Sequence, residues 1–218
     1  MGVFERALLY ALSRPTEFWQ AVGQHVLLTI SAVLIALMIA LPLGVGTARS
    51  RWMSLTVINT VNALRVIPSL AVLFLVIPYF GLSATAAVVA LTLLAIPPIL
   101  LNTDAAFRSL EPGLIEAARG MGMSSLQILR RVEFPLALPV ILTGVRTAAI
   151  LAIAIATIGS KFGAGGLGTL LFEGIAQAGR MDKVWAGALG VATLALAFNY
   201  GLLWLERQLT PYRAVETT

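Results

Sequence analysis

The chain has 218 residues, of which 59% are hydrophobic and 11% are charged, whereas soluble domains are about one quarter charged. A soluble fold of this size has no core large enough to bury so much apolar surface, so the composition predicts an integral membrane protein. The net charge is +5, but the basic residues flank apolar stretches, so we expect no nucleic-acid partner. Without cysteine, and with His25 as the one histidine, we expect no metal site and no cofactor. We expect His25 to be a partly buried or interfacial imidazole.

Five apolar stretches are long enough to cross a bilayer, which takes about 20 residues. The second and third come from one uncharged run, in which Pro78, Gly81 and Ser83 mark a turn. After the fourth stretch comes a glycine-rich loop, and then residues 169–183, for which we predict a short interfacial helix. The predicted spans are 26–48, 57–79, 84–105, 138–158 and 184–205.

Lysine and arginine in short loops set the orientation of membrane proteins, because positive loops stay in the cytoplasm. Arginines are found after the first span, in the polar segment 106–135 and in the C-terminal residues, so we place these three on the cytoplasmic side. The N-terminus, the turn at 80–83 and the loop at 159–183 then face outward, although this loop also contains lysine and arginine. We divide the chain into an N-terminal segment (1–20), a transmembrane domain (21–210) and a tail (211–218).

Small residues crowd the fourth and fifth spans, from Ala148 to Gly159 and from Ala186 to Ala197. Such residues let helix backbones approach closely in lipid, where dispersion and weak hydrogen bonds hold helices together. Packing within the chain is the favoured interpretation, and a subunit interface is the other.

One motif stands out in the polar segment 106–135. It reads Glu116-Ala-Ala-Arg-Gly-Met-Gly122, then nine residues, then Val132-Glu-Phe-Pro135. Glycine permits a backbone turn that a side chain obstructs, Ser124 or Ser125 can cap a following helix, and proline favours a break. The motif therefore predicts a helix, a glycine turn and a second helix that ends at Pro135.

This motif resembles the cytoplasmic signature of permease subunits of bacterial ATP-binding-cassette (ABC) importers of the type I fold. That signature is Glu-Ala-Ala, three residues, Gly, nine residues and Ile-x-Leu-Pro, with Val132 and Phe134 here in place of Ile and Leu. The resemblance covers about residues 22–207. It implies an all-α membrane protein with five transmembrane helices, the type I ABC importer permease (MetI-like) fold, in the bacterial inner membrane.

Three further stretches resemble the branch of these permeases that imports osmoprotectants such as glycine betaine, choline and carnitine. They are residues 120–124, 139–147 and 163–168. The last of these, and the stretch Arg65-Val-Ile-Pro-Ser69, are shared with methionine-importer permeases. The resemblance therefore implies a quaternary-ammonium importer first and a methionine importer as the alternative.

The resemblance also implies partners. These are a second permease chain, identical or paralogous, a cytoplasmic ATPase dimer and an external substrate-binding protein. The chain lacks a Gly-x-x-x-x-Gly-Lys-Ser/Thr phosphate loop, so we expect ATP hydrolysis in the separate subunit and no enzymatic activity here. The residues implied in docking the ATPase are Glu116, Ala117, Ala118, Gly120, Gly122, Met123 and Ser124.

Four residues are candidates for the pathway or its gate: Arg65, Pro68, Asp104 and Arg146. Charges inside spans are costly and face protein or water. Arg146 is then a gate or coupling residue, a snorkelling side chain, or the partner of Asp104 or Glu133. Arg65 precedes a predicted kink at Pro68 that lines the path, or it is an interfacial arginine. Because arginine repels cations, we do not assign Arg65 to substrate binding.

At the outer side, Gly163, Gly165, Gly166 and Gly168 are candidates for contact with the binding protein, or form only a turn before the interfacial helix. Phe74, Tyr79 and Phe80 form either a transient cage for a quaternary ammonium group or, as we favour, an interfacial aromatic belt. The spans lack the paired carboxylates of a proton-driven carrier, so an ion-driven secondary transporter is the more distant alternative.

Overall fold

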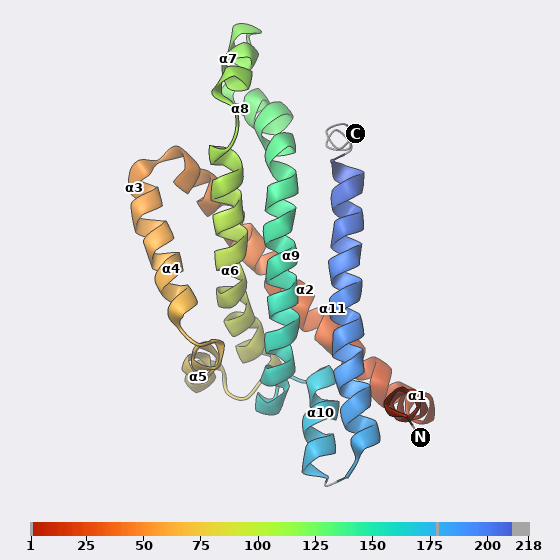
Figure 1. Ribbon diagram of the computed structural model, residues 1–218. Coiled ribbons are helices and arrows are strands. Elements are labelled where there is room, and N and C mark those ends of the chain that lie inside the picture. The colour runs from red at the N-terminus through yellow and green to blue at the C-terminus, as the bar shows by residue number, and fades with distance from the viewer. Residues whose placement is uncertain (1, 178, 211–218) are drawn as a thin grey trace.

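The computed structural model describes residues 2–177 and 179–210, and within these residues it contains helices and no strand (Figure 1). Four helices are long and apolar enough to cross a membrane, and a fifth span is obtained if a bent pair is counted as one. The prediction of an all-α protein with five spans is confirmed, whereas the predicted tail 211–218 lies outside the described residues. The elements are α1 (Val3–Ser13), α2 (Pro15–Arg49), α3 (Arg51–Met53), η1 (Ser54–Ile58), α4 (Asn59–Val66), α5 (Ser69–Phe80), α6 (Ala84–Arg108), α7 (Pro112–Gly120), α8 (Ser125–Ile128), η2 (Leu129–Glu133), α9 (Phe134–Gly159), η3 (Ser160–Phe162), α10 (Leu167–Ala176) and α11 (Met181–Leu209).

The second span is broken rather than kinked. The helix over Arg51–Val66 and the helix α5 meet at an angle of 97°. Ile67 adopts an extended backbone because a residue that precedes proline is pushed out of the helical region, and Pro68 then caps α5. The break at Pro68 follows the sequence prediction, but the single span expected at 57–79 is corrected to two half-helices.

The first span is much longer than its apolar stretch. Helix α2 has 35 residues and is therefore about 52 Å long at 1.5 Å per residue. It begins at Pro15, because proline is well tolerated in the first turn of a helix, and it continues through Pro42. It exceeds the thickness of the hydrocarbon core and crosses obliquely behind α6, α9 and α11 (Figure 1).

The second helix of the polar motif does not end at Pro135. Residues Ser125–Phe162 form one continuous helical span, in which η2 is a π-helical turn. The amide of Phe134 donates to the carbonyl of Leu129, five residues earlier, and Pro135 lies in the first turn of α9. A proline is tolerated at that position, so the predicted break is wrong and the motif runs directly into a transmembrane helix.

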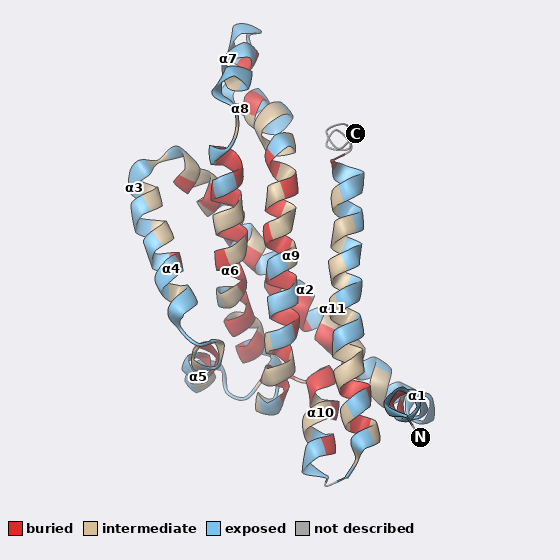
Figure 2. Ribbon diagram, viewed as in Figure 1, coloured by how far each residue is buried: buried red, intermediate tan, exposed pale blue. Residues whose placement is uncertain are grey.

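The core is built on two faces on which every fourth residue is alanine or glycine. Helix α6 lies between these faces, and Figure 2 shows buried residues concentrated along α6 and α9, whereas α4 is mostly exposed and most of α11 is exposed or only partly buried. Small residues permit close backbone approach in lipid. The small-residue face of α2 is Ala32, Ala36, Ala40 and Gly44, and that of α9 is Gly144, Ala148, Ala152 and Ala156.

The two glycines of these faces mark close approaches of α6 to α2 and α9. A Cβ atom at Gly44 would lie 2.6 Å from Cβ of Thr103, and one at Gly144 would lie 2.7 Å from Cβ of Asn102. Packing within the chain is thus confirmed for the fourth span. In the fifth span Ala186 is buried, but most of the remaining small residues are only partly covered or exposed.

We predict that Gly44→Val destabilises the protein by roughly 1–3 kcal/mol, because overpacking forces α2 and α6 apart. Thermal melting of the purified protein in detergent measures the effect. Gly23→Val in the same helix is the matched control, because a Cβ atom there meets nothing within 4 Å. An equal loss in both variants would contradict the role of the α2–α6 contact.

Candidate functional site

The predicted functional segments lie at opposite ends of the molecule. Helices α7 and α8 form one end, together with the α2–α3 turn and the last turns of α11 (Figure 1). The glycine-rich loop, α10 and α1 lie at the other end. The segments predicted to share the cytoplasmic side therefore share one end of the bundle.

At the first end, α7 presents an apolar surface outside the bundle. Ala118 is buried against its own chain, whereas Glu116 and Ala117 are exposed. Leu114 and Met121 are exposed as well, Met121 to 75%. The two alanines of the motif thus have different roles. Ala118 packs α7 against the rest of the chain, and Ala117 lies on a surface suited to a protein partner.

Helix α7 ends in a Schellman motif. The amide of Met123 donates to the carbonyl of Ala118, and the amide of Gly122 donates to that of Arg119. Gly122 has φ +78°, a left-handed conformation that other residues adopt only with strain, while a Cβ atom there would meet nothing within 4 Å. Glycine is therefore required for its backbone conformation and not for space.

Ser124 caps the next helix, as one of the two predicted serines. Its hydroxyl accepts from the amide of Gln127, and its own amide donates to Oε1 of Gln127 at 2.7 Å. This capping box fixes the start of α8, which continues through η2 into α9. A partner that binds α7 and α8 would therefore be connected directly to the transmembrane helix α9.

Ion pairs hold the helices together near this end. Arg49 pairs with Glu133, which joins α2 to η2. Arg108 pairs with Asp104 at 2.9 Å and also donates to the carbonyl oxygen of Thr47 at 2.6 Å, which joins α6 to α2. Asp104, a predicted gate residue, is buried, and its Oδ1 atom has no hydrogen-bond partner among the described residues.

Arg146 pairs with Glu206 on α11 at 3.5 Å. The expected alternative, an ion pair with Asp104 or Glu133, is wrong, because those carboxylates bind Arg108 and Arg49. Both side chains of the pair are largely covered, at 22% and 17% exposure. Arg146 therefore ties α9 to α11.

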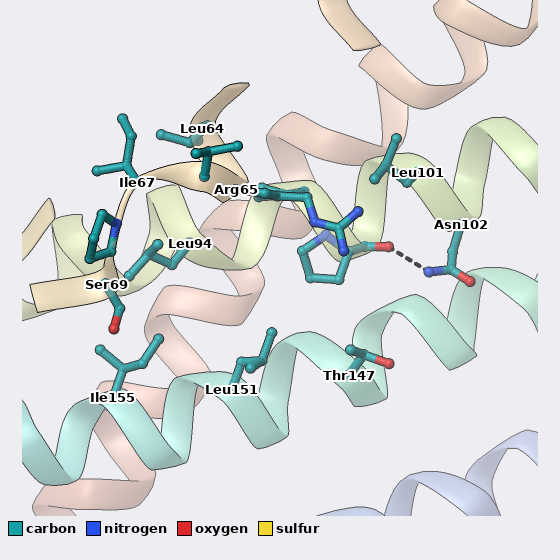
Figure 3. Close-up of a pocket in the computed structure, with 14 residues that line it drawn as sticks. Leu64, Arg65, Ile67, Ser69, Leu94, Leu101, Asn102, Thr147, Leu151 and Ile155 are labelled. Atoms are coloured by element: carbon teal, nitrogen blue, oxygen red, sulfur yellow. Dashed lines mark hydrogen bonds between the residues drawn. The ribbon is translucent and has the colours of Figure 1, made fainter. Parts of the chain in front are cut away.

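A cavity of about 570 Å³ lies where the broken helix meets α6 and α9 (Figure 3). Arg65 and Pro68 line it, whereas Asp104 and Arg146 do not. The structure thus brings together two of the four predicted pathway residues. The full lining is residues 64–69, Leu94, Pro97, Pro98, Leu101, Asn102, Thr147, Leu151 and Ile155.

Sequence reasoning missed two polar residues of this cavity, Asn102 and Thr147. Both are polar residues inside predicted spans, which is the signal that could have found them. Asn102 donates to the carbonyl of Pro98 at 2.8 Å, and Thr147 donates to that of Thr143 at 2.9 Å. Each retains polar atoms that can bind a solute or water.

At the other end, the glycines of the loop are required for packing within the chain. Gly163, Gly165 and Gly166 all have positive φ, and a Cβ atom at Gly165 would lie 2.7 Å from Oε1 of Gln24. The amide of Gly166 donates to this same oxygen at 3.1 Å. Gly166 and Gly168 are buried, so in this conformation only Gly163 and Gly165 are open to contact from outside.

His25 lies beneath this loop and is fully buried, more deeply than the partly buried or interfacial position we expected. Its Nε2 atom lies 3.1 Å from the carbonyl oxygen of Ile153, so the ring bridges α2 and α9. A Cβ atom at Gly166 would lie 3.1 Å from Nδ1 of the same ring. The histidine thus packs helices and loop together.

Several positive charges at the end that carries the glycine-rich loop have local partners. Lys183 lies 2.7 Å from Glu17 and 2.6 Å from Glu173, which joins α11 to α2 and α10. Arg180 pairs with Asp182. Beside this cluster, burial raises the pKa of the Tyr10 hydroxyl to about 12, so it stays protonated. The charges of Lys183 and Arg180 are therefore neutralised by nearby carboxylates. This explains how the loop at 159–183 can contain basic residues although we predict that it faces outward.

The aromatic residues near the turn at 80–83 are spread over the surface. Tyr79 is 83% exposed and Phe80 is also exposed. Phe74 packs edge-on against Phe162, with ring centroids 5.1 Å apart. This distribution fits the interfacial belt better than a cage, in which several rings surround one point.

Comparison with known proteins identifies the architecture. Residues 33–211 match the family of binding-protein-dependent transport system inner membrane components. The chain belongs to this family. This permease is 42% identical over 193 residues to the osmoprotectant import permease protein of Salmonella typhimurium, covering 86% of this chain and 89% of that protein.

Two further relatives and one solved structure are also transport proteins. The carnitine transport permease protein of Listeria monocytogenes is 40% identical, over 86% of each chain. The choline transport system permease protein of Bacillus subtilis is 35% identical, over 100% of this chain and 96% of that protein. Among solved structures, an inward-facing methionine ABC transporter matches with a TM-score of 0.78 and 25% identity, over 93% of this permease and 98% of that chain.

We predict that Arg146 has a structural role that its ion pair explains. Arg146→Glu should cost roughly 1–3 kcal/mol, because it places a second carboxylate beside Glu206. The exchanged pair, Arg146→Glu with Glu206→Arg, should restore both the melting temperature and uptake by the assembled transporter. Restored stability without restored uptake would instead show that the guanidinium is needed at position 146 itself.

Proposed function

We propose that this permease is the membrane-spanning subunit of an ABC importer for osmoprotectants, meaning glycine betaine, carnitine, choline or a related quaternary amine. The observation that carries the proposal is the set of relatives at 35–42% identity, which are named as osmoprotectant, carnitine and choline permeases. The docking motif at α7 and α8 supports the same assignment, because its exposed apolar residues suit an ATPase partner.

In the proposed mechanism, a cytoplasmic ATPase dimer binds α7 and the start of α8. ATP binding and release move this end, and the movement reaches the membrane through the continuous helix Ser125–Phe162. This helix lines the cavity through Thr147, Leu151 and Ile155. A rigid element that connects the docking site to the cavity lets nucleotide state bias which conformation is populated.

The cavity is bounded on one side by the broken helix, and Arg65 and Pro68 are exposed at its margin. We infer that a second permease chain, identical or paralogous, completes the pathway. The exposed surfaces of α4 and α11 provide room for it or for lipid (Figure 2). An external binding protein would deliver the solute at the end that carries Gly163 and Gly165.

Uptake by the reconstituted transporter tests this function. Proteoliposomes that contain the permease, its ATPase, its partner permease chain and binding protein should accumulate labelled betaine, carnitine or choline only when ATP is supplied on the ATPase side. Uptake of methionine alone would favour the methionine alternative. Accumulation by the permease alone, driven by an ion gradient, would favour a secondary transporter.

We predict an orientation with α7 in the cytoplasm of a bacterium and the turn before α6 outside, in the inner membrane. The chain has no cysteine, so single-cysteine variants give unambiguous labelling. In intact cells, Leu82→Cys should react with a membrane-impermeant maleimide, and Glu111→Cys should react only after lysis. Both positions are exposed. The opposite pattern would overturn the assigned orientation.

We predict that Gly122→Leu abolishes uptake while the protein still reaches the membrane. The substitution strains the left-handed turn by about 1–2 kcal/mol and changes how α7 meets its partner. Gly23→Leu is the control, because Gly23 is helical, lies outside α7 and α8, and a Cβ atom there meets nothing within 4 Å. Co-purification of the ATPase and ATP-driven uptake are measured together. Normal values in Gly122→Leu would contradict the docking assignment.

A further inference from the structure

The cavity between the broken helix, α6 and α9 has one charged group, the guanidinium of Arg65. No aspartate or glutamate lines it. Among the described residues, the ion pairs of the bundle involve other arginines, and Arg65 is in none of them. Arginine stays protonated in proteins, so the cavity carries a permanent positive charge without a carboxylate of its own.

The guanidinium is also directed into the cavity. Figure 3 shows the Arg65 side chain turned toward the side where Asn102 and Thr147 lie, along α6 and across from α9. Leu94 and Thr147 are in the middle parts of their helices, so the cavity lies at membrane depth. A charge at that depth is costly unless it faces water, protein partners or a ligand.

The break in the second span adds to the positive character of this site. Helix α5 begins at Ser69, which lines the cavity, and the amino-terminal end of a helix carries partial positive charge. Half-helices that start in the middle of a membrane commonly direct this end at anionic groups of a solute. The helix end and the guanidinium therefore favour the same kind of ligand group, a carboxylate.

The lining has no group that would attract the positive charge of a quaternary ammonium ion. The lining has no aromatic side chain, so it cannot form a cation–π cage, and it has no anionic group. The apolar side chains Leu94, Leu101, Leu151 and Ile155 suit instead the methyl groups that surround a quaternary nitrogen. The ammonium end of a solute can pack there while its carboxylate is bound elsewhere.

We propose that Arg65 binds the carboxylate of a zwitterionic solute in the translocation cavity, so that this permease passes glycine betaine and carnitine in preference to choline. The inference rests on the proposed function and deepens it. Choline has a cationic nitrogen and no carboxylate, so its net charge is repelled by Arg65. Glycine betaine and carnitine have no net charge, and their carboxylates can form the paired hydrogen bonds that a guanidinium offers. This removes the objection that excluded Arg65 from substrate binding.

The test is ATP-driven uptake of labelled glycine betaine and choline by the complete transporter in proteoliposomes, at saturating binding protein. Wild type should transport betaine faster than choline. Arg65→Gln should lower the betaine rate about tenfold or more, as expected for loss of a hydrogen bond to a charged group, and should leave choline uptake unchanged or raise it. Arg65→Lys, which keeps the charge, should retain more betaine uptake than Arg65→Gln.

Arg51→Gln is the matched control, because Arg51 is exposed and lies outside the cavity. It removes the same charge and should leave both rates within about twofold, since an exposed charge far from the solute contributes little. If Arg65→Gln fails to assemble, Thr147→Glu tests the same idea with Arg65 intact. The new carboxylate competes for the guanidinium and should lower betaine uptake selectively.

The outcomes separate the two proposals. Wild type that transports no quaternary amine refutes the proposed function. Wild type that transports choline as well as or better than betaine, or an equal loss of both solutes in Arg65→Gln or Thr147→Glu, overturns the carboxylate site and leaves the osmoprotectant function standing. A selective loss of betaine in either variant supports the site.

Discussion

The structure depends on the close approach of α6 to the helices on both sides of it. In lipid there is no hydrophobic driving force between helices, so they associate through dispersion at short distance, which requires small residues. Alanine and glycine at every fourth position of α2 and α9 meet this requirement, and Gly44 and Gly144 leave room for atoms of α6 that any side chain would displace. The three helices thus form a rigid core. The broken helix and α11, whose residues are less buried, are arranged around it.

This core explains how one end of the permease can act on the other. Residues Ser125–Phe162 form a single helical element that starts beside α7, carries the small-residue face of α9 and lines the cavity. A displacement at α8 cannot be absorbed by a break at Pro135, since none exists. The second span is instead broken at Ile67 and Pro68, next to the group proposed to bind the solute.

Much of this architecture could be predicted from the sequence because lipid imposes simple rules on length and charge. The five spans, the turn marked by Gly81 and Ser83, the cap at Ser124 and the glycine turn at Gly122 follow from local chemistry. Three features did not. The angle at Pro68 depends on what α5 packs against, and continuity through Pro135 depends on a preceding π-helical turn. The partner of Arg146 depends on which carboxylates are already paired with arginines of the neighbouring helices. The first and the third are set by tertiary contacts, as is the placement of Arg65 in one cavity with Asn102 and Thr147.

The length of α2 has a consequence for the whole molecule. This helix is longer than the bilayer core is thick, and it holds the glycine loop through Gln24 near its beginning and pairs with η2 through Arg49 at its end. Helix α2 therefore connects the two ends of the permease directly. A tilt of the end that carries the glycine-rich loop would be transmitted along α2 to the end that carries α7 and α8, independently of the cavity beside the broken helix.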